Sequence, residues 1–91
     1  MSELDRFREE ITEIDRAIFA AINRRLLVVA ELRRYKVEHG LAFLDPGREE
    51  AMVAERLAEN GGPLSEEGLR AIHAELLALV KRELDADHEA P

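Results

Sequence analysis

Basic side chains on a predicted helix are the residues of this chain best suited to bind a ligand. Arg25 interrupts an apolar row of a heptad pattern, a place where an unpaired buried guanidinium is costly. Lys36 lies within about 20° of the same helix face and about 16 Å further along the axis. Two long cationic side chains at this separation can bracket a small anion. The alternative is that Arg25 snorkels to solvent or pairs with an Asp or Glu of its own fold.

A second group of polar residues lies in the stretch FLDPGREEAM, residues 43–52. Asp45 followed by proline is typical of a helix N-cap and first helical position. The apolar connection before it, LAFL, should pack down and bring Asp45, Arg48 and Glu49 toward Lys36. The alternative is that Asp45 is a cap and nothing more, and that Arg48 and Glu49 form a surface ion pair of little energetic value.

The other basic residues are weaker candidates for a site. Arg8 lies beside the apolar seam, about 25 Å from Arg25 on a straight helix, so it can reach the same ligand only from a second chain. Taken alone, Arg8 is more typical of a salt bridge at the rim of an interface. Arg24, Arg33 and Arg34 fall on other faces and are predicted to be solvated.

Three helices are expected to position these residues, within one domain that covers residues 1–91. The first has an a/d apolar pattern with no Gly or Pro before Gly40, a natural residue to follow a helix end. Ser2 and Ser65 are predicted N-caps. The predicted ranges are about 3–39, 46–59 and 66–85, followed by an acidic tail, 86–91, that should fray. The predicted fold class is therefore all-α.

The first predicted helix is too long for the rest of the chain to cover. It spans roughly 54 Å, whereas a compact domain of this size has a diameter of about 30 Å. Soluble proteins avoid long exposed apolar stripes, so a second copy of the chain should cover the remainder. We therefore expect an intertwined helical homodimer.

Composition excludes several classes of function. The formal net charge of −7 argues against binding to nucleic acid or to anionic membranes. There is no cysteine, and the three His residues lack the spacing of metal ligands, so we expect no disulfide and no metal site. The N-terminal segment has no apolar signal region and no apolar run is long enough to span a bilayer, which predicts a soluble cytoplasmic protein.

With this ordered set of residues, the chain resembles the all-helical chorismate mutases, which are intertwined dimers of three helices per protomer. The resemblance covers nearly the whole chain and rests on three stretches, FREEITEIDRAIFAAINRR with Arg8, Asp15 and Arg25, ELRRYKVEHG with Lys36, and DPGREE with Asp45, Arg48 and Glu49. It implies an isomerase of aromatic amino acid biosynthesis, in the shikimate pathway, that converts chorismate to prephenate without a cofactor.

The resemblance also implies roles for the cations. Arg25 and the Arg8 of a second copy would bind the two carboxylates of the substrate, since the guanidinium matches a carboxylate in bidentate geometry. Lys36 would donate to a carboxylate and to the ether oxygen. The rearrangement needs no nucleophile or acid–base pair, so catalysis would consist of holding a compact conformer and stabilising charge on that oxygen.

On the other side of the expected pocket, Glu49 would accept from the ring hydroxyl, assisted by the backbone at Asp45, and Arg48 would shape that side and add positive potential. The third helix departs from the family, because Val80 and Leu84 occupy positions where a Ser and a Gln or Glu usually face the pocket. Leu84 cannot donate a hydrogen bond to the ether oxygen. We therefore expect a weak enzyme, one with a reshaped C-terminal half, or one that gains activity by docking on an aromatic-pathway enzyme.

Two further hypotheses remain open from the sequence. One is a related mutase or lyase that acts on isochorismate or an amino analogue, although a lyase fits poorly with Glu49 and its DPxRE segment. The other is a non-catalytic helical dimer that regulates a partner enzyme, which Val80 and Leu84 favour. His73, on the apolar face of the third helix, is predicted to be a packing residue at the edge of the core.

Overall fold

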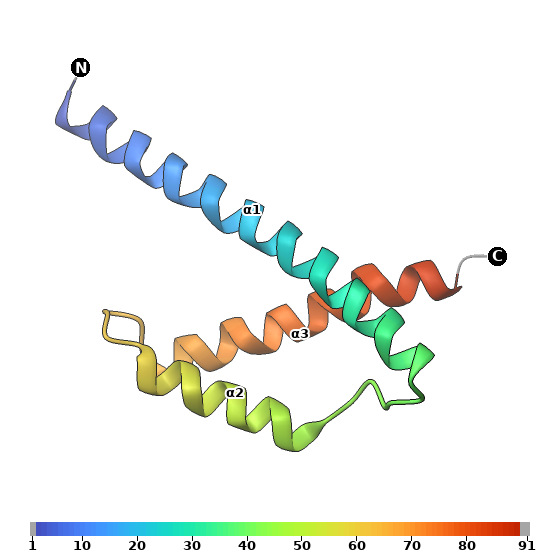
Figure 1. Ribbon diagram of the computed structural model, residues 1–91. Helices are drawn as coiled ribbons and strands as arrows, with labels where there is room; N and C mark the ends of the chain where they lie inside the picture. The colour runs from blue at the N-terminus through green and yellow to red at the C-terminus, as the bar shows by residue number, and fades with distance from the viewer. Residues whose placement is uncertain (1, 90–91) are drawn as a thin grey trace.

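The fold is all-α, as predicted. The computed structural model describes residues 2–89, with side chains for residues 2–85. Within this range it contains three helices, α1 (Glu3–Glu38), α2 (Pro46–Glu59) and α3 (Glu66–Glu89), and no strand (Figure 1). The first two lie within one residue of their predicted bounds. The third extends to Glu89 rather than 85, because no Gly or Pro interrupts the helix there; residues 90–91 of the predicted frayed tail lie outside the described range.

Local capping signals set the helix ends. The Ser2 side chain accepts from the Asp5 N–H at 3.1 Å, and the Ser65 side chain accepts from the Gly68 N–H at 3.0 Å. Gly40 follows α1 with φ +65°, a left-handed conformation that glycine adopts without strain. These caps confirm what the sequence predicts from residues within one turn of each helix end.

The three helices form an open arrangement (Figure 1). Helices α2 and α3 lie alongside each other as an antiparallel pair, and the C-terminal part of α1 crosses α3, while the N-terminal half of α1 extends away from both. The Cα radius of gyration is 16.9 Å, and the extents are 56 × 34 × 17 Å. A compact chain of this length has a radius of gyration of about 12 Å. A single protomer is therefore far from globular.

Almost no side chain of the single protomer is buried. Val53, at 7% exposed, is the one buried residue among those the structure describes. The apolar a/d residues of α1 are each 47–58% exposed, namely Leu4, Phe7, Ile11, Ile14, Ile18, Val28, Leu32 and Tyr35. The accessible surface is 7522 Å², whereas a compact monomer of this mass exposes about 5,400 Å². The fold thus leaves a continuous apolar stripe uncovered along α1.

An ion pair joins α1 to α3. The Arg33 guanidinium donates to Oδ1 of Asp85, and it also lies over the Phe43 ring at 5.2 Å from the ring centre. The Arg33 side chain is 20% exposed. The prediction that Arg33 is a solvated charge is therefore wrong, because α3 crosses α1 at this residue and brings a carboxylate to it.

Candidate functional site

Arg25 and Lys36 lie on the C-terminal half of α1, in the part that α3 crosses. Both are half-buried, whereas Arg24 and Arg34 are exposed. The Lys36 Nζ donates to the backbone carbonyl of Phe43 at 3.2 Å. This hydrogen bond holds the connection between α1 and α2 beside the lysine.

Within the described side chains, no carboxylate neutralises the guanidinium of Arg25. Among residues 2–85, no side chain makes a hydrogen bond or ion pair with Arg25, and no carboxylate lies within ion-pair distance of Lys36. The internal partner that the sequence left open for Arg25 is thus not present in the described protomer. Two half-buried cations on one helix face favour an anionic ligand as their partner.

Asp45 acts as the N-cap of α2. Its Oδ1 accepts from the Arg48 N–H at 3.1 Å, which is the local reason that α2 begins at Pro46. The preceding connection does not pack down as predicted, since Leu44 is 85% and Leu41 51% exposed. Phe43 is the residue of this connection that contacts the helices, since its ring lies against the Arg33 guanidinium and lines a hollow with Val37 and Leu84.

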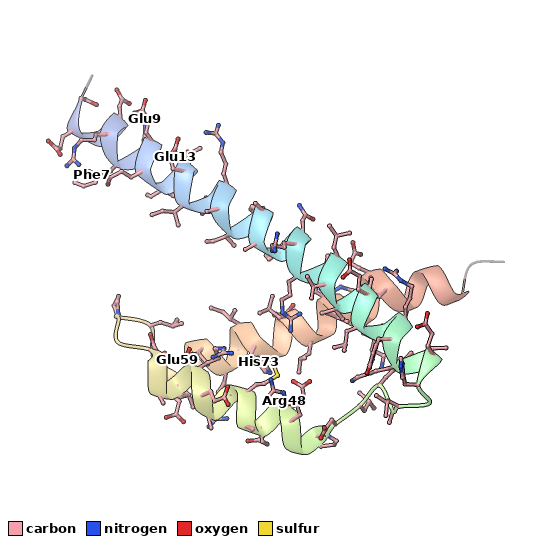
Figure 2. The ribbon with its side chains drawn as sticks, in the orientation of Figure 1. Phe7, Glu9, Glu13, Arg48, Glu59 and His73 are labelled. Carbon is pink, nitrogen blue, oxygen red and sulfur yellow. The ribbon has the colours of Figure 1, made fainter. Side chains whose placement is uncertain are left out.

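Glu49 lies in the first turn of α2 and contacts α3. Its Oε2 is 3.2 Å from Nε2 of His73, whose side chain is only 13% exposed, against 40% for Glu49. Figure 2 shows His73 extending from α3 toward α2, the helix that also carries Arg48. The guanidinium of Arg48 has no ion-pair partner among the described residues.

His73 is the functional candidate that sequence reasoning missed. The predicted packing role fits its burial, but its ring nitrogen also contacts a predicted site residue 24 positions away. The signal in the sequence is a polar ring on an otherwise apolar helix face. Its partner could not be identified, because the register of α2 against α3 is not a local property.

Val80 and Leu84 are half-buried on α3 and present no hydrogen-bonding group. Leu84 lines an open hollow of about 380 Å³ between α1, α3 and the connection before α2. The lining comprises Ala30, Arg33, Arg34, Val37, Glu38, Phe43 and Leu84. Neither Arg25 nor Lys36 is part of it, so the protomer places Leu84 on the Arg33 side of α1.

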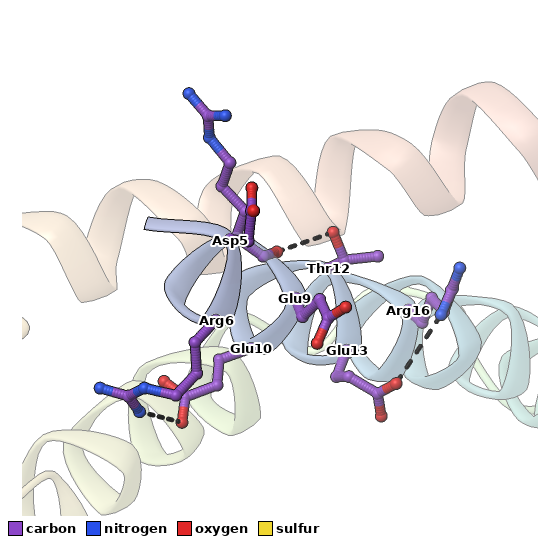
Figure 3. A pocket seen from close by; sticks show the side chains of 8 residues that line it. Asp5, Arg6, Glu9, Glu10, Thr12, Glu13 and Arg16 are labelled. Atoms are coloured by element: carbon purple, nitrogen blue, oxygen red, sulfur yellow. Dashed lines mark hydrogen bonds and ion pairs between the residues drawn. The ribbon is translucent and has the colours of Figure 1, made fainter. Parts of the chain in front are cut away.

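Arg8 lies far from the other candidates, on the free half of α1. It lines an open surface of α1 together with acidic and basic side chains and the hydroxyl of Thr12. Figure 3 labels the other lining residues, namely Asp5, Arg6, Glu9, Glu10, Thr12, Glu13 and Arg16. Arg6 pairs with Glu10 and Arg16 with Glu13, whereas within the described side chains no carboxylate pairs with Arg8. The single protomer therefore does not bring Arg8 to Arg25 or Lys36.

The chemistry available at these residues is electrostatic. Among the described residues, no group of three or more His, Asp or Glu side chains could hold a metal ion, and no helix has the length and apolar character to cross a membrane. Arg25 and Lys36 on α1 offer guanidinium and ammonium donors, and Glu49 on α2 offers a carboxylate. Such a set can bind an anion with a hydroxyl or amino group and stabilise charge that develops on an oxygen.

Sequence comparisons place the chain among helical mutases. A family model described as "Chorismate mutase type II" matches residues 7–83. A T-protein of Enterobacter agglomerans is 36% identical over 59 residues, which is 65% of this chain and 16% of that protein. The 4-amino-4-deoxychorismate mutase of Streptomyces venezuelae is 33% identical over 57 residues, which is 63% of this chain and 54% of that protein. The chain thus spans less than two thirds of the length of these relatives.

Solved structures give the same result for the fold. Chorismate mutase (Form I) from Thermus thermophilus superposes with a TM-score of 0.82 at 33% identity, covering 87% of this chain and 99% of that one. Form II of the same protein gives a TM-score of 0.84 at 32% identity, covering 97% of both chains.

Proposed function

We propose, because this chain belongs to the chorismate mutase type II family, that it rearranges chorismate to prephenate in a pocket shared between two copies of the chain. The observation that carries this proposal is the pair of half-buried cations, Arg25 and Lys36, which no carboxylate among residues 2–85 neutralises. A doubly negative substrate supplies the missing charge. The pathway is aromatic amino acid biosynthesis, and the cytoplasm is the compartment we propose for it.

The reaction is unimolecular, since a C–O bond breaks while a C–C bond forms within one molecule. Arg25 would bind one carboxylate of the substrate, and Arg8 from the second copy would bind the other. Together they would hold the molecule in a compact conformer. The Lys36 ammonium would turn from the Phe43 carbonyl toward the ether oxygen, where negative charge grows as the C–O bond breaks.

The carboxylate of Glu49 would face the opposite side of the substrate. One of its oxygens has no hydrogen-bond partner among the described residues, so it is available to accept from the ring hydroxyl. Backbone at Asp45 would assist, and Arg48 would add positive potential at the same side.

A second copy of this chain is the occupant we propose for the apolar stripe of α1. The accessible surface of one protomer exceeds that of a compact monomer by roughly 2,000 Å². Burial of that area on each of two copies gives an interface within the range of obligate homodimers, roughly 2,000–5,000 Å² in total. The dimer would also bring the free half of α1, with Arg8, toward the other copy.

Replacing Ile18 with aspartate is expected to break this dimer and unfold the chain. The side chain lies in the middle of the stripe, 49% exposed in the protomer, and burying a carboxylate there without a partner costs several kcal/mol. Sedimentation equilibrium and circular dichroism would report the loss of dimer and helix. Asn23→Asp adds the same charge on the outward face of α1 and should stay dimeric; a wild-type monomer would contradict the proposal.

The resemblance to the family, rather than the single protomer, places residue 84 beside the ether oxygen. On that basis, replacing Leu84 with glutamine is expected to raise kcat for chorismate about tenfold, since one hydrogen-bond donor to a developing charge is worth about 10²–10³ in rate when well placed. Leu84→Met, which changes shape but adds no donor, is the matched control. An unchanged or lower rate in Leu84→Gln would mean that Leu84 does not face the ether oxygen, in line with the hollow that it lines with Arg33.

The function is tested by following chorismate loss and identifying the product, with Arg25→Ala and Lys36→Ala alongside. If the wild type forms prephenate and both variants lose this activity, the mutase is supported. Pyruvate release would instead indicate a lyase. No turnover, with or without an aromatic-pathway enzyme as partner, would favour a non-catalytic regulatory dimer. Turnover that appears only with the partner would mean that docking completes the site.

A second candidate substrate is 4-amino-4-deoxychorismate, the compound named in the Streptomyces venezuelae relative. It differs from chorismate in the ring group that would face Glu49. The same assay with both compounds distinguishes the two substrates.

A further inference from the structure

The contact between His73 and Glu49 links the two shorter helices. Among residues 2–85 it is the only side-chain hydrogen bond that joins α2 to α3. It engages Oε2 of Glu49 and leaves the other carboxylate oxygen without a partner in the described protomer. Because the His73 side chain is 13% exposed, water competes little for this bond. The bond therefore restricts the rotamers of Glu49 while one oxygen stays open to a ligand.

The direction of this hydrogen bond follows from the chemistry of its partners. An ionised carboxylate can only accept, so Nε2 of His73 must carry the proton that it shares with Glu49. A donor placed against one oxygen draws negative charge away from the other. In a half-buried site this influence is stronger than in water, because the local dielectric constant is lower.

We propose that His73 is a specificity-determining residue that sets how negative Glu49 is where it meets the substrate ring, and thereby favours a ring hydroxyl over a ring ammonium. This inference rests on the proposed function. A hydroxyl needs only a hydrogen-bond acceptor, which Glu49 remains when His73 donates to it. An ammonium gains most from a carboxylate with its full charge, since charge-assisted hydrogen bonds are about twice as strong as neutral ones.

Arg48 acts in the same direction. It lies one position before Glu49 in the first turn of α2, and no carboxylate among the described side chains neutralises it. A positive group on α2 and a donor on α3 therefore both reduce the attraction of this end of the site for a second cation.

Two substitutions at His73 separate its hydrogen bond from its packing. His73→Phe keeps an aromatic ring between α2 and α3 but removes the donor, and His73→Gln keeps an N–H donor. We expect the ratio of kcat/KM for 4-amino-4-deoxychorismate to that for chorismate to rise about tenfold in His73→Phe, the factor that about 1.4 kcal/mol of differential binding gives. The ratio in His73→Gln should stay within about threefold of wild type.

Two controls test whether the effect passes through Glu49. Adding Glu49→Gln to His73→Phe should abolish the rise in the ratio, because the carboxylate that attracts the ammonium is then absent. Asp85→Asn removes the ion pair that joins α3 to Arg33 of α1, away from Glu49, and should leave the ratio unchanged.

The inference and the proposed function fail in different ways. An unchanged ratio in His73→Phe, or an equal change in His73→Phe and His73→Gln, overturns the role of His73 even if chorismate is converted. Calorimetric affinities for both compounds measure ground-state binding without turnover, and their ratio should shift in the same direction in His73→Phe. Binding without conversion would therefore overturn only the proposed function, and no binding of either compound would overturn both.

Discussion

Replacing Lys36 with alanine is expected to lower kcat for chorismate by about 10²–10³-fold, the usual effect of removing one donor from a developing oxyanion. The lysine is the cation of α1 nearest the connection to α2, where its ammonium now donates to the carbonyl of Phe43. Without the ammonium, the negative charge that develops on the ether oxygen would lose its hydrogen-bond donor. KM should change less than kcat, because the interaction strengthens in the transition state. Steady-state kinetics on chorismate measure both quantities.

Arg34→Ala is the matched control for this variant, since it removes one positive charge from the same turn of α1 at an exposed position. Its kcat should stay within about twofold of wild type, because exposed surface charges contribute little. Equal losses in Lys36→Ala and Arg34→Ala would point to a general electrostatic effect of α1 and would contradict the assignment of Lys36 to the reacting oxygen.

Mixing two nearly inactive variants, Arg8→Ala and Lys36→Ala, is expected to restore activity. In the proposed dimer each pocket takes Lys36 from one copy and Arg8 from the other. A mixed dimer therefore contains one pocket with both changes and one pocket with neither. With random exchange of copies, about a quarter of all pockets are intact, a consequence of two-fold symmetry alone. Activity should recover from below about 1% to about 25% of wild type.

The experiment requires co-refolding of the two variants and assay at constant total concentration. Arg8→Ala mixed with Arg24→Ala, which changes an exposed residue outside the pocket, controls for effects of mixing itself. If the Arg8 and Lys36 variants stay inactive together while subunit exchange is demonstrated by mass spectrometry, the two residues do not meet in one shared pocket. If Arg8→Ala alone is fully active, Arg8 is only a rim residue of α1.

Arg33 and Arg34 differ in exposure although the sequence treats them alike. Arg33 and Arg34 are neighbours in the same stretch of α1, and the sequence predicts that both are solvated. Arg34 is exposed, while Arg33 pairs with Asp85 and lies over Phe43. Helical periodicity gives the angle of each side chain around its own axis. It does not give the position at which another helix crosses, and that crossing decides which arginine is covered.

Much of the candidate site follows from sequence periodicity. Lys36 and Arg25 share a helix face because of the repeat of the helix itself, and Asp45 caps α2 because a proline follows it. The pairing of Glu49 with His73 does not follow from either rule. It depends on the register of α2 against α3, which side-chain packing across the two helices sets.

By itself, the sequence determined the three helices, their caps, the long apolar stripe of α1 and the face on which the cations lie, because each depends on residues within a few positions of one another. Only the tertiary structure decided that Arg33 is bound to α3, that His73 contacts Glu49, and that the stripe stays uncovered in one protomer. The physical reason is that hydrogen bonds within a helix reach only four residues. The crossing of one helix over another depends on side chains far apart in the chain, and these become neighbours only once the helices pack.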